Sequence, residues 1–259
     1  MSATIHPTAV VEPDVIIGKG AVIGPHCFIQ SGAEIGPECR LASSVWISGF
    51  VRLGARNEVH HGTALGGEPQ DLKFGGEETF LNIGDDNVIR EFVTMNRGTS
   101  ASGKTVVGSG NLIMAYVHVA HDCRLGDNLV LANAVNMAGH VTIENSAILG
   151  GLVPIHQFCR IGAHSMVGTG ARIVQDVPPY SLVGADPTRI AGINRIGLKR
   201  RRFSAESISA LKRAFRYIYR SGLNLSVARE RIAEEYSGVE EIRELLEFIE
   251  KSERGIILK

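Results

Sequence analysis

The chain has 259 residues, of which 44% are apolar, and its 27 basic residues are balanced by 27 acidic ones. A chain of this length can form one large domain, or a large and a small one, around a sizeable core. The balanced charge argues against a protein whose whole surface binds nucleic acid, because such binding requires a basic surplus.

The sequence contains no run of about 18 apolar residues, and its N-terminus lacks the basic and apolar regions of a signal peptide. The four cysteines, at positions 27, 39, 123 and 159, form neither a CxxC pair nor a compact disulfide spacing. We therefore expect a cytoplasmic protein without a membrane span, whose cysteines stay reduced as small core residues.

A period of six runs through most of the chain. Every sixth residue from Ile5 to Leu65, and again from Val107 to Ile173, is Ile, Val, Leu or Met. The faces of an α-helix repeat near 3.6 residues, so a helix does not explain this period. Hexads are typical of coils in which each hexad forms a short strand and a corner, and three hexads close one turn of about 18 residues. The sequence thus predicts a mainly β fold, a parallel β-helix over residues 1–190.

The hexad register breaks at two places. Residues 66–82 are polar and glycine-rich, and we expect them to form a loop that projects from the β-helix. Residues 97–106 predict a second, shorter excursion. Long loops of this kind in compact folds are often functional.

After Ile173 the pattern changes. Two prolines, Pro178 and Pro179, are expected to end regular strand pairing. From residue 203 the apolar period becomes helical, with Ser204 as the N-cap of a first helix and Gly222 at its end. Further helices are expected near 226–236 and 239–253. Residues 191–259 therefore predict a C-terminal helical domain that covers the end of the β-helix.

Histidines recur at the predicted coil spacing. The hexads that begin at residues 119, 137 and 155 share one face, which places His121, His140 and His156 along neighbouring corners, and His118 ends the preceding hexad. Histidine is the usual base near neutral pH, and Asp122 is adjacent to His121 and can orient it.

Two chemistries fit such a cluster. In acyl transfer, a neutral imidazole takes a proton from a hydroxyl as it attacks a thioester, and the backbone N–H of Gly139 contacts the developing oxyanion. In a zinc site, three imidazoles and a water bind the metal, with His118, His121 and His140 as the candidate ligands. The spacing alone leaves both open.

Residues 195–220 carry nine basic side chains against one acid, Glu206. In a chain of zero net charge this is a local asymmetry, which favours an acidic partner or a phosphate-bearing ligand.

Several segments together resemble one family, the UDP-N-acetylglucosamine O-acyltransferases that begin lipid A synthesis. The resemblance covers essentially the whole chain and rests on the hexads and on QDLKF (70–74), HVAHDC (118–123), MAGH (137–140), PIHQFCRIGAH (154–164), QDVPPY (175–180) and GLKRRRFS (197–204).

The resemblance implies a left-handed β-helix, a homotrimer with active sites between subunits, and transfer of a 3-hydroxyacyl chain from acyl carrier protein to the sugar 3-position. It implies His121 as the general base, Asp122 as its orienting partner and Gly139 as the oxyanion donor. It implies no metal and no cofactor beyond the phosphopantetheine arm of the carrier protein. Six matching positions would hold the nucleotide sugar or the acyl chain: Asp71, Lys73, His118, His140, His156 and Gln157. Three would contact the uridine diphosphate end or the carrier protein: Asn194, Arg200 and Arg201.

Three positions depart from the family pattern or vary within it. Asn96 replaces a frequent histidine, which keeps open a 3-amino sugar as the acceptor and N-acylation as the reaction. Ile196 replaces a glutamate near the uridine, and Thr169 stands where the acyl-chain length is set. The alternatives are a trimeric zinc hydratase of the same fold, a non-catalytic assembly protein, and the related N-acyltransferase, which carries an extra N-terminal domain.

Overall fold

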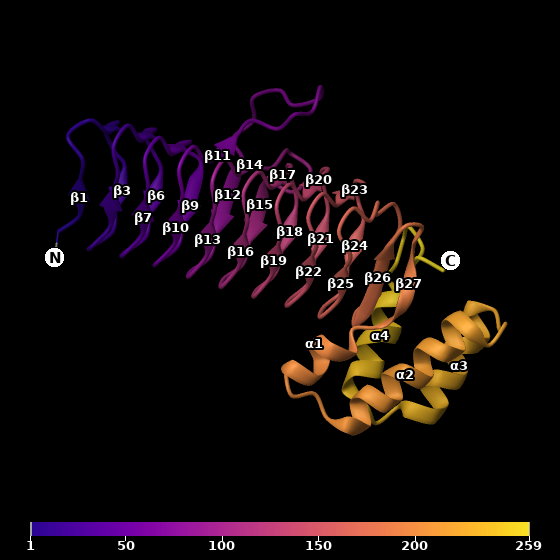
Figure 1. The fold of residues 1–259 in the computed structure, drawn as a ribbon. Helices are drawn as coiled ribbons and strands as arrows, with labels where there is room; N and C mark the ends of the chain where they lie inside the picture. The colour runs from indigo at the N-terminus through magenta and orange to yellow at the C-terminus, as the bar shows by residue number, and fades with distance from the viewer. Residues whose placement is uncertain (1, 259) are drawn as a thin grey trace.

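The computed structural model describes residues 2–258, which form a left-handed parallel β-helix followed by four helices (Figure 1). The strands are short, and each pairs in parallel with the equivalent strand of the next coil. The prediction of a mainly β fold built from hexads is therefore confirmed.

The strands form the three faces of a prism. The 11-stranded first sheet contains, in spatial order, β1 (Thr4–Ile5), β4 (Val22–Ile23), β7 (Arg40–Leu41), β10 (Glu58–Val59), β13 (Val88–Ile89), β16 (Leu112–Ile113), β19 (Val130–Leu131), β22 (Ile148–Leu149), β25 (Met166–Val167), β26 (Ser181–Ala185) and β27 (Thr188–Ile193). The eight-stranded second sheet contains β2 (Val10–Val11), β5 (Phe28–Ile29), β8 (Trp46–Ile47), β11 (Ala64–Gly67), β14 (Thr94–Asn96), β17 (His118–Val119), β20 (Asn136–Met137) and β23 (Pro154–Ile155). The eight-stranded third sheet contains β3 (Ile16–Ile17), β6 (Glu34–Ile35), β9 (Val51–Leu53), β12 (Phe80–Ile83), β15 (Lys104–Val107), β18 (Arg124–Leu125), β21 (Thr142–Ile143) and β24 (Arg160–Ile161).

The interior is filled by the hexad aliphatics and by the small residue four positions after each. All four cysteines occupy this second slot and are buried, free thiols, as the sequence predicted. The stack is less well covered at its N-terminal end, where Ile5 is 45% exposed, because within residues 2–258 no coil lies below it. In contrast, Ile113 in the middle of the stack is fully buried.

Insertions at the corners leave the coils aligned. Residues 68–79, between β11 and β12, project away from the prism, and residues 97–103 form the shorter connection between β14 and β15 (Figure 1). Across these interruptions three buried asparagines form one ladder. The side chain of Asn87 donates to Oδ1 of Asn57, 30 residues earlier, and the backbone N–H of Asn111 donates to Oδ1 of Asn87, 24 residues earlier. Oδ1 of Asn111 in turn accepts from the N–H of Leu129, 18 residues later.

The expectation that the prolines end strand pairing is wrong. Val177 pairs with Ile161, and β26 pairs in parallel with β25 beyond the prolines. Pro178 and Pro179 occupy the corner between these segments, where a residue without an N–H interrupts no ladder. β26 then turns back into β27 as an antiparallel hairpin, which the sequence did not predict.

Four helices follow: α1 (Arg195–Arg200), α2 (Ala205–Arg220), α3 (Leu225–Tyr236) and α4 (Glu240–Glu250). The Ser204 side chain accepts from the N–H of Ser207 and caps α2, as predicted, and Gly222 follows its last residues with φ +75°. The short helix α1 was not predicted, and the boundary expected after residue 190 falls within β27.

The helices lie beside the last coils and pack on each other (Figure 1). The segment after α4 returns to the prism, where the N–H of Ile257 donates to the carbonyl of Asp176 and the Ile257 side chain joins the β-helix core. The end of the core is thus covered by this last segment together with the hairpin. Within residues 2–258, no helix is long and apolar enough to cross a membrane.

Candidate active site

His121 and Asp122 occupy the corner that follows β17. Nδ1 of His121 lies 2.8 Å from Oδ2 of Asp122, and the Asp122 side chain is buried while the imidazole keeps some contact with solvent. Nε2 of His121 has no hydrogen-bond partner among the described residues. This pairing makes Nδ1 the donor to the carboxylate and leaves Nε2 with a free lone pair.

The Asp122 carboxylate accepts hydrogen bonds from residues of the 97–103 connection. Oδ1 accepts from the N–H of Thr99 at 3.0 Å and from the hydroxyl of Ser102, and Oδ2 accepts from the Thr99 hydroxyl at 2.7 Å. Burial favours the neutral acid, but the bonds from Ser102, His121 and Thr99 outweigh it and hold the pKa of Asp122 below its usual value. The carboxylate therefore remains ionised beside the imidazole.

His140 lies one coil further along, at the corner that follows β20. Its ring makes an edge contact with that of His121 at a centroid distance of 5.2 Å, and its Nε2 lies 3.7 Å from Oδ2 of Asp122. The other face of His140 stacks on Phe158, with the ring centroids 4.6 Å apart. One carboxylate is thus shared by two imidazoles, with the closer bond to His121.

Gly139 is required by the position of the His121 ring. A Cβ at residue 139 would lie 2.5 Å from Cε1 and 2.7 Å from Nε2 of His121, closer than real Cβ atoms approach. The Gly139 N–H has no hydrogen-bond acceptor within residues 2–258. An unpaired backbone donor therefore lies beside the free imidazole nitrogen.

Among the described residues, His118 and His156 lie outside the close group formed by His121, Asp122 and His140. His118 is half-buried on β17, where its Nδ1 lies 2.8 Å from the Thr94 hydroxyl. Burial, and then the proximity of His121, lower the pKa of His118 below its usual value. His156 and Gln157 are exposed, and Nδ1 of His156 bonds only to the Gln157 carbonyl, at 3.1 Å. Phe158, and not His156, contacts His140.

The three imidazoles considered for zinc are not assembled as a ligand set. Among the described residues, the only group of three side chains that brings candidate ligand atoms within 4.8 Å of one another is His121, Asp122 and His140, and His118 is not in it. In this group Nδ1 of His121 bonds to Asp122 at 2.8 Å, so the three imidazoles of the predicted zinc site are replaced by two imidazoles and a carboxylate.

Asp71 and Lys73 lie on the projecting segment, within residues 68–79. Lys73 is exposed, and its N–H donates to Oδ1 of Asp71 in a local turn. Asn96 and Arg97 hold the base of this segment: Nδ2 of Asn96 donates to the Glu68 carbonyl at 2.7 Å. The buried Asn96 is thus a loop anchor in this chain.

Asn194 and Arg201 lie where the helical domain meets the last coils. Asn194 caps α1 through the N–H of Gly197, and its Nδ2 donates to the His164 carbonyl at 3.0 Å. Nη1 of Arg201 donates to the Ser146 carbonyl at 2.7 Å and lies 3.3 Å from Nδ1 of His164. Arg200 and Ile196 are exposed, as is Thr169 at the corner before the last coil.

The sequence missed Thr99, Ser102 and Phe158 as members of this site. The hydroxyl-rich string in residues 97–106 was visible, and the break in the hexads marked it as an excursion. Its contact with Asp122, however, depends on how the connection folds back over more than 20 residues. The hexad spacing does not contain that information.

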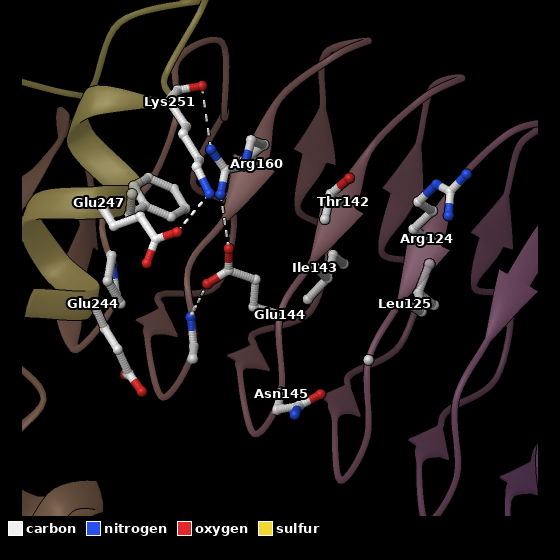
Figure 2. Close-up of a pocket in the computed structure, with 14 residues that line it drawn as sticks. Arg124, Leu125, Thr142, Ile143, Glu144, Asn145, Arg160, Glu244, Glu247 and Lys251 are labelled. Carbon is white, nitrogen blue, oxygen red and sulfur yellow. Dashed lines mark hydrogen bonds and ion pairs between the residues drawn. The ribbon is translucent and has the colours of Figure 1, made fainter. Parts of the chain in front are cut away.

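A separate groove of about 550 Å³ lies between the outer face of β18, β21 and β24 and helix α4 (Figure 2). Arg160 spans it: the guanidinium contacts Glu144 at 2.9 Å and lies over the Phe248 ring at 4.3 Å. Lys251 is likewise paired with Glu247. Because these charges are paired with one another, the groove is an interface that holds α4 against the prism, and none of its lining residues belongs to the histidine site.

Comparisons with known proteins place the chain in a family. The family model described as "Udp N-acetylglucosamine O-acyltransferase; Domain 2" matches residues 176–257, and the one described as "Bacterial transferase hexapeptide (six repeats)" matches residues 2–31 and 104–139.

Whole-length relatives agree with these models. The acyl-[acyl-carrier-protein]–UDP-N-acetylglucosamine O-acyltransferase of Thiobacillus denitrificans is 47% identical over 98% of this chain and 99% of its own, and that of Burkholderia orbicola is 50% identical over 98% of both. The crystal structure of LpxA from Acinetobacter baumannii superposes with a TM-score of 0.95 at 41% identity, covering 98% of this chain and 99% of that one. The chain therefore belongs to the acyl-[acyl-carrier-protein]–UDP-N-acetylglucosamine O-acyltransferase family.

Proposed function

We propose that this protein transfers a 3-hydroxyacyl chain from acyl carrier protein to the 3-hydroxyl of UDP-N-acetylglucosamine, the first step of lipid A synthesis. The observation that carries the proposal is the His121–Asp122 pair, with the free Nε2 of His121 beside the unpaired N–H of Gly139. These are the base and the oxyanion donor that acyl transfer requires, and they occur in a chain similar to O-acyltransferases over its whole length.

The geometry supports the following chemistry. Nε2 of His121 takes the proton of the sugar 3-hydroxyl as the oxygen attacks the thioester carbonyl, and Asp122 stabilises the imidazolium that forms. The carbonyl oxygen becomes an oxyanion and accepts a hydrogen bond from the Gly139 N–H. When the tetrahedral intermediate collapses, the C–S bond breaks and the imidazolium returns its proton to the thiolate of the phosphopantetheine arm.

The remaining predicted residues are proposed to bind the two substrates. Asp71, Lys73, His118, His140, His156 and Gln157 would hold the nucleotide sugar or the acyl chain, and Thr169 would limit the chain's length. Asn194, Arg200 and Arg201 would contact the uridine diphosphate or the carrier protein. The exposure of Lys73, His156, Arg200 and Thr169 in the single chain supports contacts with substrate or a neighbouring subunit.

The reaction as proposed uses no metal and no cofactor beyond the carrier's phosphopantetheine. We place the protein in the cytoplasm, where acyl carrier protein and nucleotide sugars are made. The free, buried thiols of all four cysteines agree with a reducing compartment.

We propose a homotrimer with active sites between subunits. Apolar side chains are exposed along one edge of the prism, at equivalent corner positions of three coils: Phe92 at 43%, Tyr116 at 62% and Leu152 at 66%. Leu72, between Asp71 and Lys73 on the projecting segment, is fully exposed. Burial of these side chains against a second copy would be favourable. Sedimentation equilibrium should give three times the 27.9 kDa chain mass, and a monomer at micromolar concentration would contradict the trimer.

The activity is tested by incubating the purified protein with UDP-N-acetylglucosamine and a ladder of 3-hydroxyacyl carrier proteins. We expect one preferred chain length and a mass-spectrometric product acylated at the 3-position. The 3-amino analogue of the sugar is the parallel acceptor, because Asn96 departs from the histidine that the family resemblance implies at this position. Absence of product with every chain length on both acceptors would overturn the proposed function.

His121→Ala tests the mechanism. Loss of a general base typically lowers the rate by ~10²–10⁴, so we expect kcat to fall by at least about 100-fold while the size of the assembly is unchanged. Activity close to wild type in this variant would show that the base is a different group.

A further inference from the structure

Three donors from one short connection converge on the carboxylate of Asp122. They are the backbone N–H and the hydroxyl of Thr99 and the hydroxyl of Ser102. With Nδ1 of His121, they give each carboxylate oxygen two hydrogen bonds. A carboxylate has about four lone-pair sites, so these four bonds occupy all of them. Rotation of the carboxylate plane would break several of the bonds, and the plane is therefore held in one orientation.

The orientation of His121 depends on this carboxylate plane. Within residues 2–258 the imidazole makes one hydrogen bond, from Nδ1 to Oδ2, and Nε2 has no hydrogen-bond partner. If the carboxylate turned, the ring would turn with it, and the alternative tautomer with the proton on Nε2 would become accessible. A base in that tautomer cannot accept the substrate proton.

The connection that supplies the donors is itself fixed at both ends. The N–H of Gly103 donates to the Thr99 carbonyl at 2.8 Å, which closes a turn. The Gly98 carbonyl accepts from the buried Thr79 hydroxyl at 2.6 Å, and the N–H of Ser100 donates to the Glu77 carboxylate at 3.0 Å. The donors are thus held in place before any substrate binds, as preorganisation requires.

We propose that Thr99 and Ser102 are positioning residues for the acyl transfer: by clamping Asp122, they keep His121 in the tautomer whose Nε2 is unprotonated. The inference deepens the proposed function and rests on it. Among the described residues, neither Thr99 nor Ser102 forms a hydrogen bond with His121, so each acts through Asp122.

Two variants remove one donor each, Thr99→Val and Ser102→Ala. Charge-assisted hydrogen bonds are stronger than neutral ones, and we expect kcat to fall about tenfold for each variant. Because neither hydroxyl is proposed to contact the sugar, KM for UDP-N-acetylglucosamine should stay within about twofold of wild type. Thr99→Ser keeps both donors of residue 99 and should restore kcat.

Ser100→Ala is the matched control. Ser100 lies in the same connection and is exposed; its side chain lies near the Glu77 carboxylate, and among the described residues it forms no hydrogen bond with Asp122. This variant should keep the wild-type kcat. Equal losses in Ser100→Ala and Ser102→Ala would assign the effect to general loosening of the connection and would overturn the proposal.

A spectroscopic readout separates this inference from the activity itself. In protein labelled with ¹⁵N-histidine, long-range couplings identify which ring nitrogen of His121 carries the proton. We expect Nδ1–H in wild type and a mixture of tautomers in the Thr99→Val, Ser102→Ala double variant. An unchanged tautomer together with wild-type kcat would overturn the inference. An inactive wild type with intact Nδ1–H would overturn only the proposed function.

Discussion

Asp122 and His140 both have backbone angles in the left-handed region, with φ of 59° and 62°. Non-glycine residues adopt this region rarely, and here it recurs at the corners of the coils. At the site it turns the chain so sharply that His121 and Asp122, adjacent in sequence, bond to each other through their side chains. The corner geometry that closes the coil therefore also forms the proposed catalytic pair.

Gly139→Ala tests how tightly this pair is enclosed. A methyl group there would overlap the His121 ring, so the ring or the corner must move. Alanine keeps the backbone N–H, but this movement would misplace the base or the oxyanion donor, so we expect kcat to fall by about 10²–10³. Gly184→Ala is the control, since its added Cβ would lie 3.9 Å from the nearest atom and should leave steady-state kinetics unchanged. Full activity in Gly139→Ala would contradict the assigned geometry.

His164 makes the stability of the protein depend on pH. Burial of its ring, and then the nearby charge of Arg201, lower the pKa of His164 to about 4, while its usual value is near 6.5. The unfolded chain binds a proton more readily, so the stability present above pH 6.5 is lost as pH falls towards 4.

We expect this His164 contribution to be about 1–2 kcal/mol, because the ring keeps some contact with solvent. Urea unfolding at a series of pH values checks it: His164→Gln should have a flatter dependence between pH 6.5 and 4 than wild type. Identical slopes in the two proteins would rule out this origin.

The attachment of the projecting segment to the prism depends on the side chain of Arg97. The Arg97 guanidinium is buried, lies over the rings of Phe50 at 4.2 Å and Phe74 at 4.9 Å, and donates to the Glu77 carbonyl at 3.1 Å. With its ion pair to Glu68 at 3.7 Å, Arg97 therefore joins both ends of segment 68–79 to the prism.

Arg97→Met keeps the aliphatic stem and removes these contacts. With a cation–π interaction of ~1–2 kcal/mol, we expect the segment to open about tenfold more often and thermolysin to cut it about tenfold faster. Arg124→Met is the control, because Arg124 is exposed and forms no ion pair among the described residues. A cleavage rate like that of wild type in Arg97→Met would place the anchor elsewhere.

The strands could be predicted from sequence because an aliphatic residue at every sixth position, such as Val119 or Met137, marks a buried core position in each strand. Helix α2 could also be predicted, from the N-cap residue Ser204 and from the helical period of its apolar residues. The hairpin β26–β27 and helix α1 could not, because Pro178 and Pro179 resemble a terminator and the segment after them has no period. The coil spacing brought His121 and His140 together, but it could not show that Phe158 would be the residue of the next coil that stacks on His140.

At the scale of the whole molecule, each coil contacts only its neighbours, so burial depends on position along the stack. Ile113→Ala, at a fully buried site, should lower the free energy of unfolding by about 2–5 kcal/mol. Ile5→Ala, at the 45% exposed end, should lower it by less than about 1 kcal/mol. Urea midpoints at one protein concentration compare the two, and equal losses would contradict a stack whose order weakens towards its N-terminal end.

Consecutive members of the asparagine ladder, Asn57, Asn87 and Asn111, stay hydrogen-bonded to each other although the length of chain between them varies. Extra residues can therefore be inserted at a corner without shifting the coils, so the loops that contact a substrate can change while the β-helix stays the same. Enzymes that share this β-helix can therefore differ in substrate through differences in their projecting loops. The same corners are natural grafting points for an engineer who wants a new binding loop on an unchanged scaffold.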